Sequence, residues 1–198
     1  GVACRGRLDG LSPFALLKLC SSVAPDSRVS IRDADHVYEV TLRGGRPVLA
    51  SCSDSDGESA RGEAVFAQLL GVGGGRFGVT PVDPGEALAC ELEGSLDELF
   101  MEPVARARAA QGLLSGTALM RVARVTLDQR RLPLDATPEP SRSLLRAVVA
   151  GTSPRELIVS GRAPAELVER VLCDAARQGA VITVLGPTHK DLLEAAYL

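Results

Sequence analysis

Hydrophobic residues recur at helical spacing in the segment 12–22, the first part of the chain with a clear pattern. The stripe consists of Phe14, Leu16, Leu17 and Cys20. Residues three and four apart lie on one side of a helix, so this stripe can be buried against another layer. Ser12 is a suitable N-cap, and Pro13 follows it where a missing amide hydrogen costs little. The pattern predicts a short amphipathic helix that begins after Ser12.

A two-residue alternation of apolar and polar positions replaces the helical spacing after residue 22. It runs through residues 29–32, 36–42 and 46–53, which are separated by an Asp-Ala-Asp turn and a Gly-Gly turn. These segments predict a three-stranded antiparallel meander with one apolar face. Residues 51–62 are small and polar, and they are predicted to form a mobile surface loop.

A second helix is predicted over residues 59–70, and a further strand over 76–82. The glycines 73–75 between them resemble a phosphate loop in composition, but the rest of the motif is absent. No Lys-Ser/Thr pair follows them, and the run leads into a strand instead of a helix, so we interpret it as a flexible turn. The front of the chain is therefore predicted to be α+β, with a small antiparallel sheet of three or four strands packed by the helices at Ser12 and Ser59.

A capping box formed by Ser95 and Glu98 marks the start of a third helix. Pro103 lies inside this helix and predicts a kink or a break, because proline removes one backbone hydrogen bond. Residues 112–117 end the helix and place a domain boundary after residue 116. The stretch 118–140 contains several prolines, and we interpret it as a tether or packing arm.

Three helices and a strand are predicted in quick succession in the remainder of the chain. They begin near Ser141, Ser153, Pro164 and Ala180. This order is typical of a winged helix-turn-helix. The predicted organisation is thus an α+β domain over residues 1–116 and a mainly helical, winged-helix-like module with an N-terminal arm over 117–198.

Charge is unevenly distributed along the 198 residues, whose formal net charge is −3. Up to Gly116 there are eleven basic and sixteen acidic residues, and after it eleven basic and nine acidic. Neither half has the strongly basic stripe that is typical of nucleic-acid-binding proteins. The exposed positions predicted for the helix that starts near Pro164 are Glu166, Glu169, Arg170, Asp174 and Arg177. Three acids against two arginines disfavour DNA recognition by this helix.

Patterns that indicate catalysis or metal binding are weak. The two histidines, His36 and His189, have no serine or cysteine at a spacing that suggests a relay, and Asp33 with Asp35 offers fewer oxygens than calcium requires. The five cysteines are scattered without a CxxC pair, and we interpret them as buried or half-buried free thiols in a reducing cytoplasm. No apolar run approaches the ~20 residues of a membrane helix. We therefore expect no enzymatic activity, metal, cofactor or membrane insertion, and a cytoplasmic location.

Four segments in a fixed order resemble the PATAN domain, a domain of unknown function found in bacterial signalling proteins. They are RLDGLSPFALLKLC, the turn GGRPVLAS, the helix GEAVFAQLLG followed by GGGRFGV, and the acidic-to-basic helix after Ser95. The resemblance covers about residues 5 to 112. It implies a non-catalytic module that docks onto other proteins, often linked to a receiver domain, in surface motility or development. No receiver domain is recognisable in this sequence, which leaves open that the chain is part of a larger protein.

The resulting hypothesis is a signal-transduction module that acts through protein–protein interaction. The most exposed candidate contact is the acidic stretch 51–62, with Asp54, Asp56 and Glu58. A second candidate is the outward face of the predicted third helix of the winged-helix-like module, with Glu169, Arg170 and Arg177. The alternative hypothesis is a winged-helix transcriptional regulator that binds DNA. The sequence leaves the identity of the partner open, as well as whether the chain forms a homodimer.

Overall fold

The structure is a computed structural model that describes residues 4–197. It divides into two compact units, residues 1–101 and 102–198, and each is described by itself. The division falls inside helix α3 (Leu96–Leu113), whereas the sequence placed a boundary after residue 116. The fold class is α+β, as predicted.

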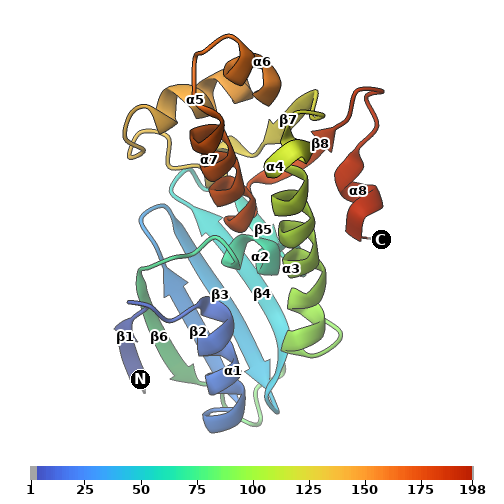
Figure 1. Cartoon of the computed structure of the whole chain (residues 1–198). Coiled ribbons are helices and arrows are strands. Elements are labelled where there is room, and N and C mark those ends of the chain that lie inside the picture. The colour runs from blue at the N-terminus through green and yellow to red at the C-terminus, as the bar shows by residue number, and fades with distance from the viewer. Residues whose placement is uncertain (1–3, 198) are drawn as a thin grey trace. The chain divides into compact units, whose positions relative to one another are not determined.

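The first unit is built on a six-stranded sheet in which every neighbouring pair of strands is antiparallel (Figure 1). The strand order is β1-β6-β2-β3-β4-β5. The strands are β1 (Cys4–Arg7), β2 (Ser27–Arg32), β3 (His36–Arg43), β4 (Arg46–Asp54), β5 (Ser59–Arg61) and β6 (Arg76–Pro81). Its helices are α1 (Pro13–Val23) and α2 (Ala64–Leu69). The meander predicted from the alternation is β2, β3 and β4.

Helices pack on one face of this sheet and bury its apolar side chains (Figure 1). Helix α1 begins as predicted, because the Ser12 hydroxyl accepts a hydrogen bond from the Ala15 amide at 3.1 Å. Leu17 on α1 and Leu69 on α2 are fully buried. The ring of Phe100, at the start of α3, packs edge-on against Phe66 at a centroid distance of 5.2 Å. The other members of the predicted stripe are also placed against the core. Leu16 and Cys20 are buried, and the Phe14 ring packs edge-on against Phe100 at a centroid distance of 5.0 Å.

Two strands of the sheet were missed by the sequence prediction, which gave three or four strands. Strand β1 has no apolar alternation, because it is an edge strand with little burial. Strand β5 lies inside the polar tract 51–62, so that tract is a hairpin of β4 and β5 and not a long loop. The helix predicted from residue 59 accordingly begins only at Ala64.

The sequence predicted a kink or a break at Pro103. Helix α3 is continuous from Leu96 to Leu113, so a break into two segments is excluded. Its start is held by the predicted capping box. The Ser95 amide donates to the Glu98 carboxylate at 2.6 Å, and the Glu98 amide donates to the Ser95 hydroxyl at 3.3 Å. The proline removes only one hydrogen bond from a helix of 18 residues, and bonds on either side preserve the helix.

The second unit is mainly helical and contains a two-stranded antiparallel sheet of β7 (Arg124–Leu127) and β8 (Val181–Leu185). Its other elements are α4 (Gly116–Leu119), a 3-10 turn (Gln129–Arg131), α5 (Ser141–Val149), α6 (Pro154–Val159), α7 (Ala165–Arg177) and α8 (Leu192–Tyr197). The predicted order of three helices and a strand is present as α5, α6, α7 and β8. The segment interpreted as a tether contains β7, which pairs with β8.

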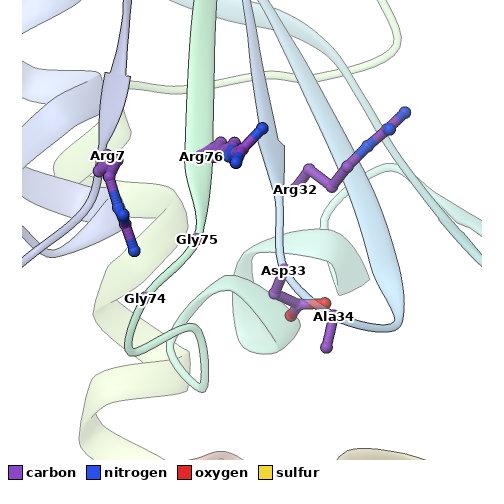
Figure 2. A pocket seen from close by; sticks show the side chains of 7 residues that line it. All are labelled: Arg7, Arg32, Asp33, Ala34, Gly74, Gly75 and Arg76. Carbon is purple, nitrogen blue, oxygen red and sulfur yellow. The ribbon is translucent and has the colours of Figure 1, made fainter.

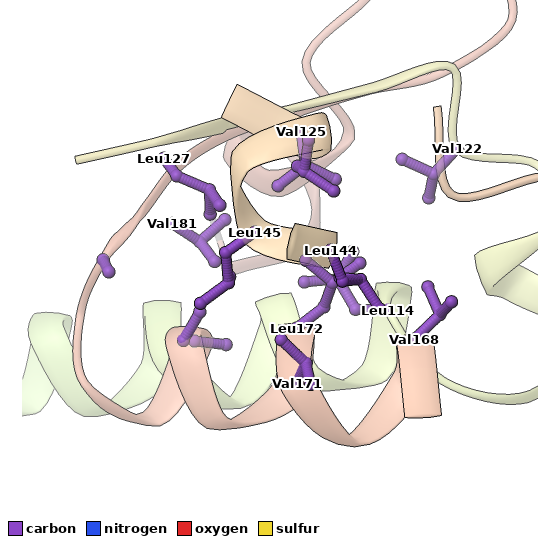
Figure 3. Close-up of a cluster of buried hydrophobic side chains, with 14 of the residues drawn as sticks. Leu114, Val122, Val125, Leu127, Leu144, Leu145, Val168, Val171, Leu172 and Val181 are labelled. Atoms are coloured by element: carbon purple, nitrogen blue, oxygen red, sulfur yellow. The ribbon is translucent and has the colours of Figure 1, made fainter. Parts of the chain in front are cut away.

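Leucine and valine side chains fill the interior of the second unit (Figure 3). Leu172 and Val168 of α7 are fully buried, as is Leu114 just after α3. Val125 of β7 contributes to the same cluster. Ser153 caps α6 by accepting a hydrogen bond from the Glu156 amide at 3.1 Å, as its position before Pro154 predicted.

Candidate functional site: an arginine row on the sheet

The face of the sheet opposite the helices carries polar side chains, because successive residues of a strand point to opposite sides. In β2, Val29 and Ile31 are buried in the core, whereas Arg28, Ser30 and Arg32 alternate with them and are half-buried or exposed. The strand register extends this pattern across the sheet. Residues that pair across strands share a face, so the polar face can be followed from strand to strand.

Three arginines lie side by side on this polar face. Arg76 of β6 pairs with Arg7 of β1 on one side and with Arg32 of β2 on the other. We call Arg7, Arg76 and Arg32 the arginine row. Neighbouring strands are about 4.8 Å apart, so the three side chains leave the backbone at closely spaced points. All three residues are exposed.

The arginine row lines a shallow pocket of about 340 Å³ together with Asp33, Ala34, Gly74 and Gly75 (Figure 2). Figure 2 shows the side chain of Arg76 between those of its two neighbours, and the Arg32 side chain extending away from that of Arg7. The guanidinium groups are therefore spread along the row and not gathered at one point. The row offers a line of positive charge to a ligand.

The glycine loop beside the row is held tightly by the two flanking strands. The Gly75 carbonyl accepts a hydrogen bond from the Leu8 amide at 2.9 Å. Gly75 has φ of +124°, and a Cβ at this position would lie 2.3 Å from the Arg32 carbonyl oxygen. Only glycine fits here, because a side chain would both strain the backbone and collide with β2. The loop thus brings bare backbone next to the guanidinium groups.

Other arginines of the same unit have partners supplied by the chain itself. Arg28 lies 3.4 Å from carboxylate oxygens of both Glu39 and Glu86. Arg43 donates hydrogen bonds to the carbonyl oxygens of Pro84 at 2.8 Å and Glu86 at 3.0 Å. Most of these partners come from the segment after β6, which is therefore tied to the sheet by arginines. The arginine charges at this end of the sheet thus face carboxylates and carbonyl oxygens, although the buried Arg43 Nε has no hydrogen-bond partner among the described residues.

Two of the three arginines of the row lack such partners. Arg7 has an ion pair with Asp9 at 3.4 Å, but both side chains are more than 70% exposed. Within residues 4–197, the side chains of Arg32 and Arg76 have no ion pair or hydrogen bond. Asp33 borders the pocket, but one of its oxygens already accepts from the backbone amides of Asp35 and His36 at 2.9 and 2.7 Å. The row therefore keeps a surplus of positive charge.

The acidic residues predicted for partner contact lie in the β4–β5 hairpin, at the other edge of the sheet from β1. Asp54 is half-buried, and its carboxylate accepts hydrogen bonds from the amides of Asp56 at 3.0 Å and Glu58 at 2.8 Å. Asp54 thus shapes the hairpin turn. Asp56 and Glu58 are exposed.

The residues predicted on helix α7 have different surroundings. Glu169 is half-buried and accepts a hydrogen bond from the Gly116 amide at 3.1 Å, so it caps the start of α4. Arg177 forms an ion pair with Asp174 one turn earlier. Arg170 is exposed.

The histidines and cysteines are dispersed. His36 lies 3.3 Å from the Asp33 carboxylate, whereas His189 sits in a turn with φ of 59°. Cys20 and Cys52 are buried and Cys173 is half-buried, as expected. Cys4 and Cys90 are exposed, because Cys4 lies on the edge strand β1 and Cys90 in the irregular segment between β6 and α3. Burial raises the pKa of the Cys20 and Cys173 thiols. Among residues 4–197, no three His, Cys, Asp or Glu side chains are grouped as metal ligands.

The arginine row was not among the residues singled out from the sequence. A usable signal was present in the short RGR motif at residues 5–7, in which two arginines alternate with glycine. It becomes informative only when β1 is placed beside β6. No helix within the described part of the chain has the length and apolar character needed to cross a membrane.

The chain matches no family model, no curated protein and no solved structure.

Proposed function

We propose that this chain is a non-catalytic module that binds a protein partner in bacterial signal transduction. The observation that carries the proposal is the arginine row, which lies exposed on the sheet face opposite the helices. Two of its members, Arg32 and Arg76, lack acidic partners of the kind that Arg28 has. Unmatched charge at a surface favours association with a complementary partner more than it favours folding. The resemblance of residues 5–112 to the PATAN domain supports the same role, with action in the cytoplasm and a link to surface motility or development.

The winged-helix alternative receives less support from the residues of α7. Of its two exposed arginines, Arg177 is already paired with Asp174, which leaves Arg170, within the part of the chain that the structure describes, as the one unpaired basic side chain of this helix. A helix that reads DNA gains affinity by releasing counterions from phosphates, which requires free basic side chains. Asp56, Glu58 and Arg170 remain available as secondary contacts for a protein partner.

The test is affinity capture from native bacterial cytoplasm after brief chemical cross-linking. The bait proteins are the wild type, the double variant Arg32→Gln/Arg76→Gln and the control Arg61→Gln. Arg61 is a suitable control because it is also an exposed arginine of this sheet, but it is paired with Glu91 at 3.2 Å. We expect one defined protein with the wild type and the control, and a strong loss with the double variant.

Titration with random duplex DNA at several salt concentrations tests the alternative. A DNA-binding regulator gives a steep decrease of affinity with salt, whereas a protein-interaction module gives no measurable binding at physiological salt. The absence of a captured protein would refute the proposed function, and steep salt-dependent DNA binding would then support the alternative.

A further inference from the structure

We propose that the pocket along the arginine row binds a phosphoryl group. The inference concerns the ligand of the candidate site, and it rests on the proposed function to the extent that a protein partner carries the group. It starts from the charges that meet on three neighbouring strands. Like charges directly opposite each other destabilise a sheet, and Arg76 has an arginine on both sides. A bound anion removes this repulsion.

The amount of charge favours a phosphoryl group over a carboxylate. A phosphoryl group carries about −1.5 to −2 charges near neutral pH and presents three acceptor oxygens. The arginine row carries three positive charges. Arg7 has an ion pair with Asp9, and the Asp33 carboxylate also lines the pocket, where its ion pair is with His36 and not with Arg32 or Arg76. A single carboxylate leaves at least one guanidinium unmatched, whereas a phosphoryl group can accept hydrogen bonds from two or three.

The walls of the pocket fit the same ligand. Its volume of about 340 Å³ is sufficient for a phosphoryl group and the atoms that carry it. Gly74 and Gly75 contribute no side chain, so the ligand can approach the backbone closely. The lining contains no aromatic side chain on which a base could stack, which disfavours single-stranded nucleic acid as the ligand.

The exposure of the arginines determines the affinity and the salt dependence that we expect for the ligand. Figure 2 shows the Arg32 side chain extending away from Arg7, so simultaneous contact with one phosphoryl group requires rotation of exposed side chains. Such rotations are fast, but ordering long side chains reduces affinity. Binding is therefore expected to be moderate and to weaken as salt is added.

The experiment is a titration of ¹⁵N-labelled protein, followed through the backbone amide resonances of Gly74, Gly75 and Arg76. One probe is inorganic pyrophosphate. The other is a short alanine-flanked phosphoserine peptide, compared with its serine and glutamate counterparts. The variants are Arg32→Gln/Arg76→Gln and the matched control Arg61→Gln. Preserved resonances elsewhere in the sheet show that each variant is folded.

We expect shifts confined to the pocket, a decrease in affinity of at least about tenfold in the double variant, and little change in Arg61→Gln. Tighter binding of the phosphoserine peptide than of pyrophosphate assigns the phosphoryl group to a protein partner, and the reverse order assigns it to a free anion. The proposal is overturned if the pocket resonances do not move, if the serine or glutamate peptide binds equally well, or if Arg61→Gln weakens binding as much as the double variant.

The failure of this proposal can be told apart from failure of the proposed function. If neither phosphoryl probe binds but the wild type still captures its partner, the ligand assignment is wrong and the interaction module stands. If the probes bind at the pocket but no protein is captured, the phosphoryl site stands and the proposed function fails.

Discussion

The two ends of the sheet face opposite the helices use arginine in different ways. At one end, Arg28 and Arg43 are held by carboxylates and by carbonyl oxygens of the segment after β6. At the other end, Arg32 and Arg76 lie next to each other and make no ion pair with residues 4–197. The same residue type thus stabilises the fold in one place and leaves charge available in the other. The difference indicates which arginines should matter for stability and which for binding.

If the arginine row is not needed for stability, the sheet must be stabilised by the apolar face on which the helices pack. Leu17→Ala and Leu69→Ala each remove a fully buried side chain from that face and should lower the free energy of unfolding by about 2–5 kcal/mol. Leu19→Ala on the exposed side of α1 is the control and should change it by less than about 0.5 kcal/mol. Denaturant titration measures both. Losses below about 1 kcal/mol at Leu17 and Leu69 would show that these helices are peripheral.

At the end of the polar face where arginines have partners within the chain, Arg43→Gln should be destabilising. Its guanidinium donates to the carbonyl oxygens of Pro84 and Glu86, and these acceptors would lose a charged donor. We expect a decrease of about 1–3 kcal/mol in the free energy of unfolding, measured by urea titration. An unchanged stability would mean that the segment after β6 is not tied to the sheet by Arg43.

In the β4–β5 hairpin, carboxylates show the same contrast between a side chain that is used by the fold and one that is left exposed. Asp54→Ala removes an acceptor used by two backbone amides and should destabilise the protein by about 0.5–1.5 kcal/mol. Asp56→Ala removes an exposed side chain and should have an effect within about 0.5 kcal/mol. Thermal unfolding of the two variants measures the difference. Equal effects would contradict the turn-forming role of Asp54.

A smaller, pH-dependent effect is expected at the start of α3. The hydrogen bonds from the backbone amide and the hydroxyl of Ser95 lower the pKa of Glu98 from its ordinary value of 4.5. A lowered pKa contributes stability that is complete above the ordinary value and is lost as the pH falls through the folded-state pKa. The stability advantage of the wild type over Glu98→Gln should therefore shrink as the pH falls from above 4.5 to below it. An advantage that stays constant over this range would contradict the capping box.

The sequence was sufficient for the parts of the fold that are governed by local signals. The cap at Ser12, the capping box at Ser95 and the alternation of β2 to β4 each predicted the element that is present. The edge strand β1 could not be predicted in this way, because a strand with little burial has no apolar period.

The arginine row was beyond prediction for a related reason. Arg7, Arg32 and Arg76 are far apart in the sequence, and only the pairing of β1, β6 and β2 makes them neighbours. The net acidity of the front of the chain also pointed to carboxylates as the contact residues. Total charge says nothing about which side chains are already paired, and Arg28, Arg43 and Asp54 show that many are.

The most direct test of the account is the stability of Arg32→Gln/Arg76→Gln relative to the wild type, measured by urea titration at low and at high salt. If the row is a site and not a structural element, the double variant is as stable as the wild type or slightly more stable at low salt, because repulsion between neighbouring charges is removed. The difference should vanish at high salt through screening. A loss of more than about 1 kcal/mol at either salt concentration would show that these arginines hold the sheet together and would contradict the account.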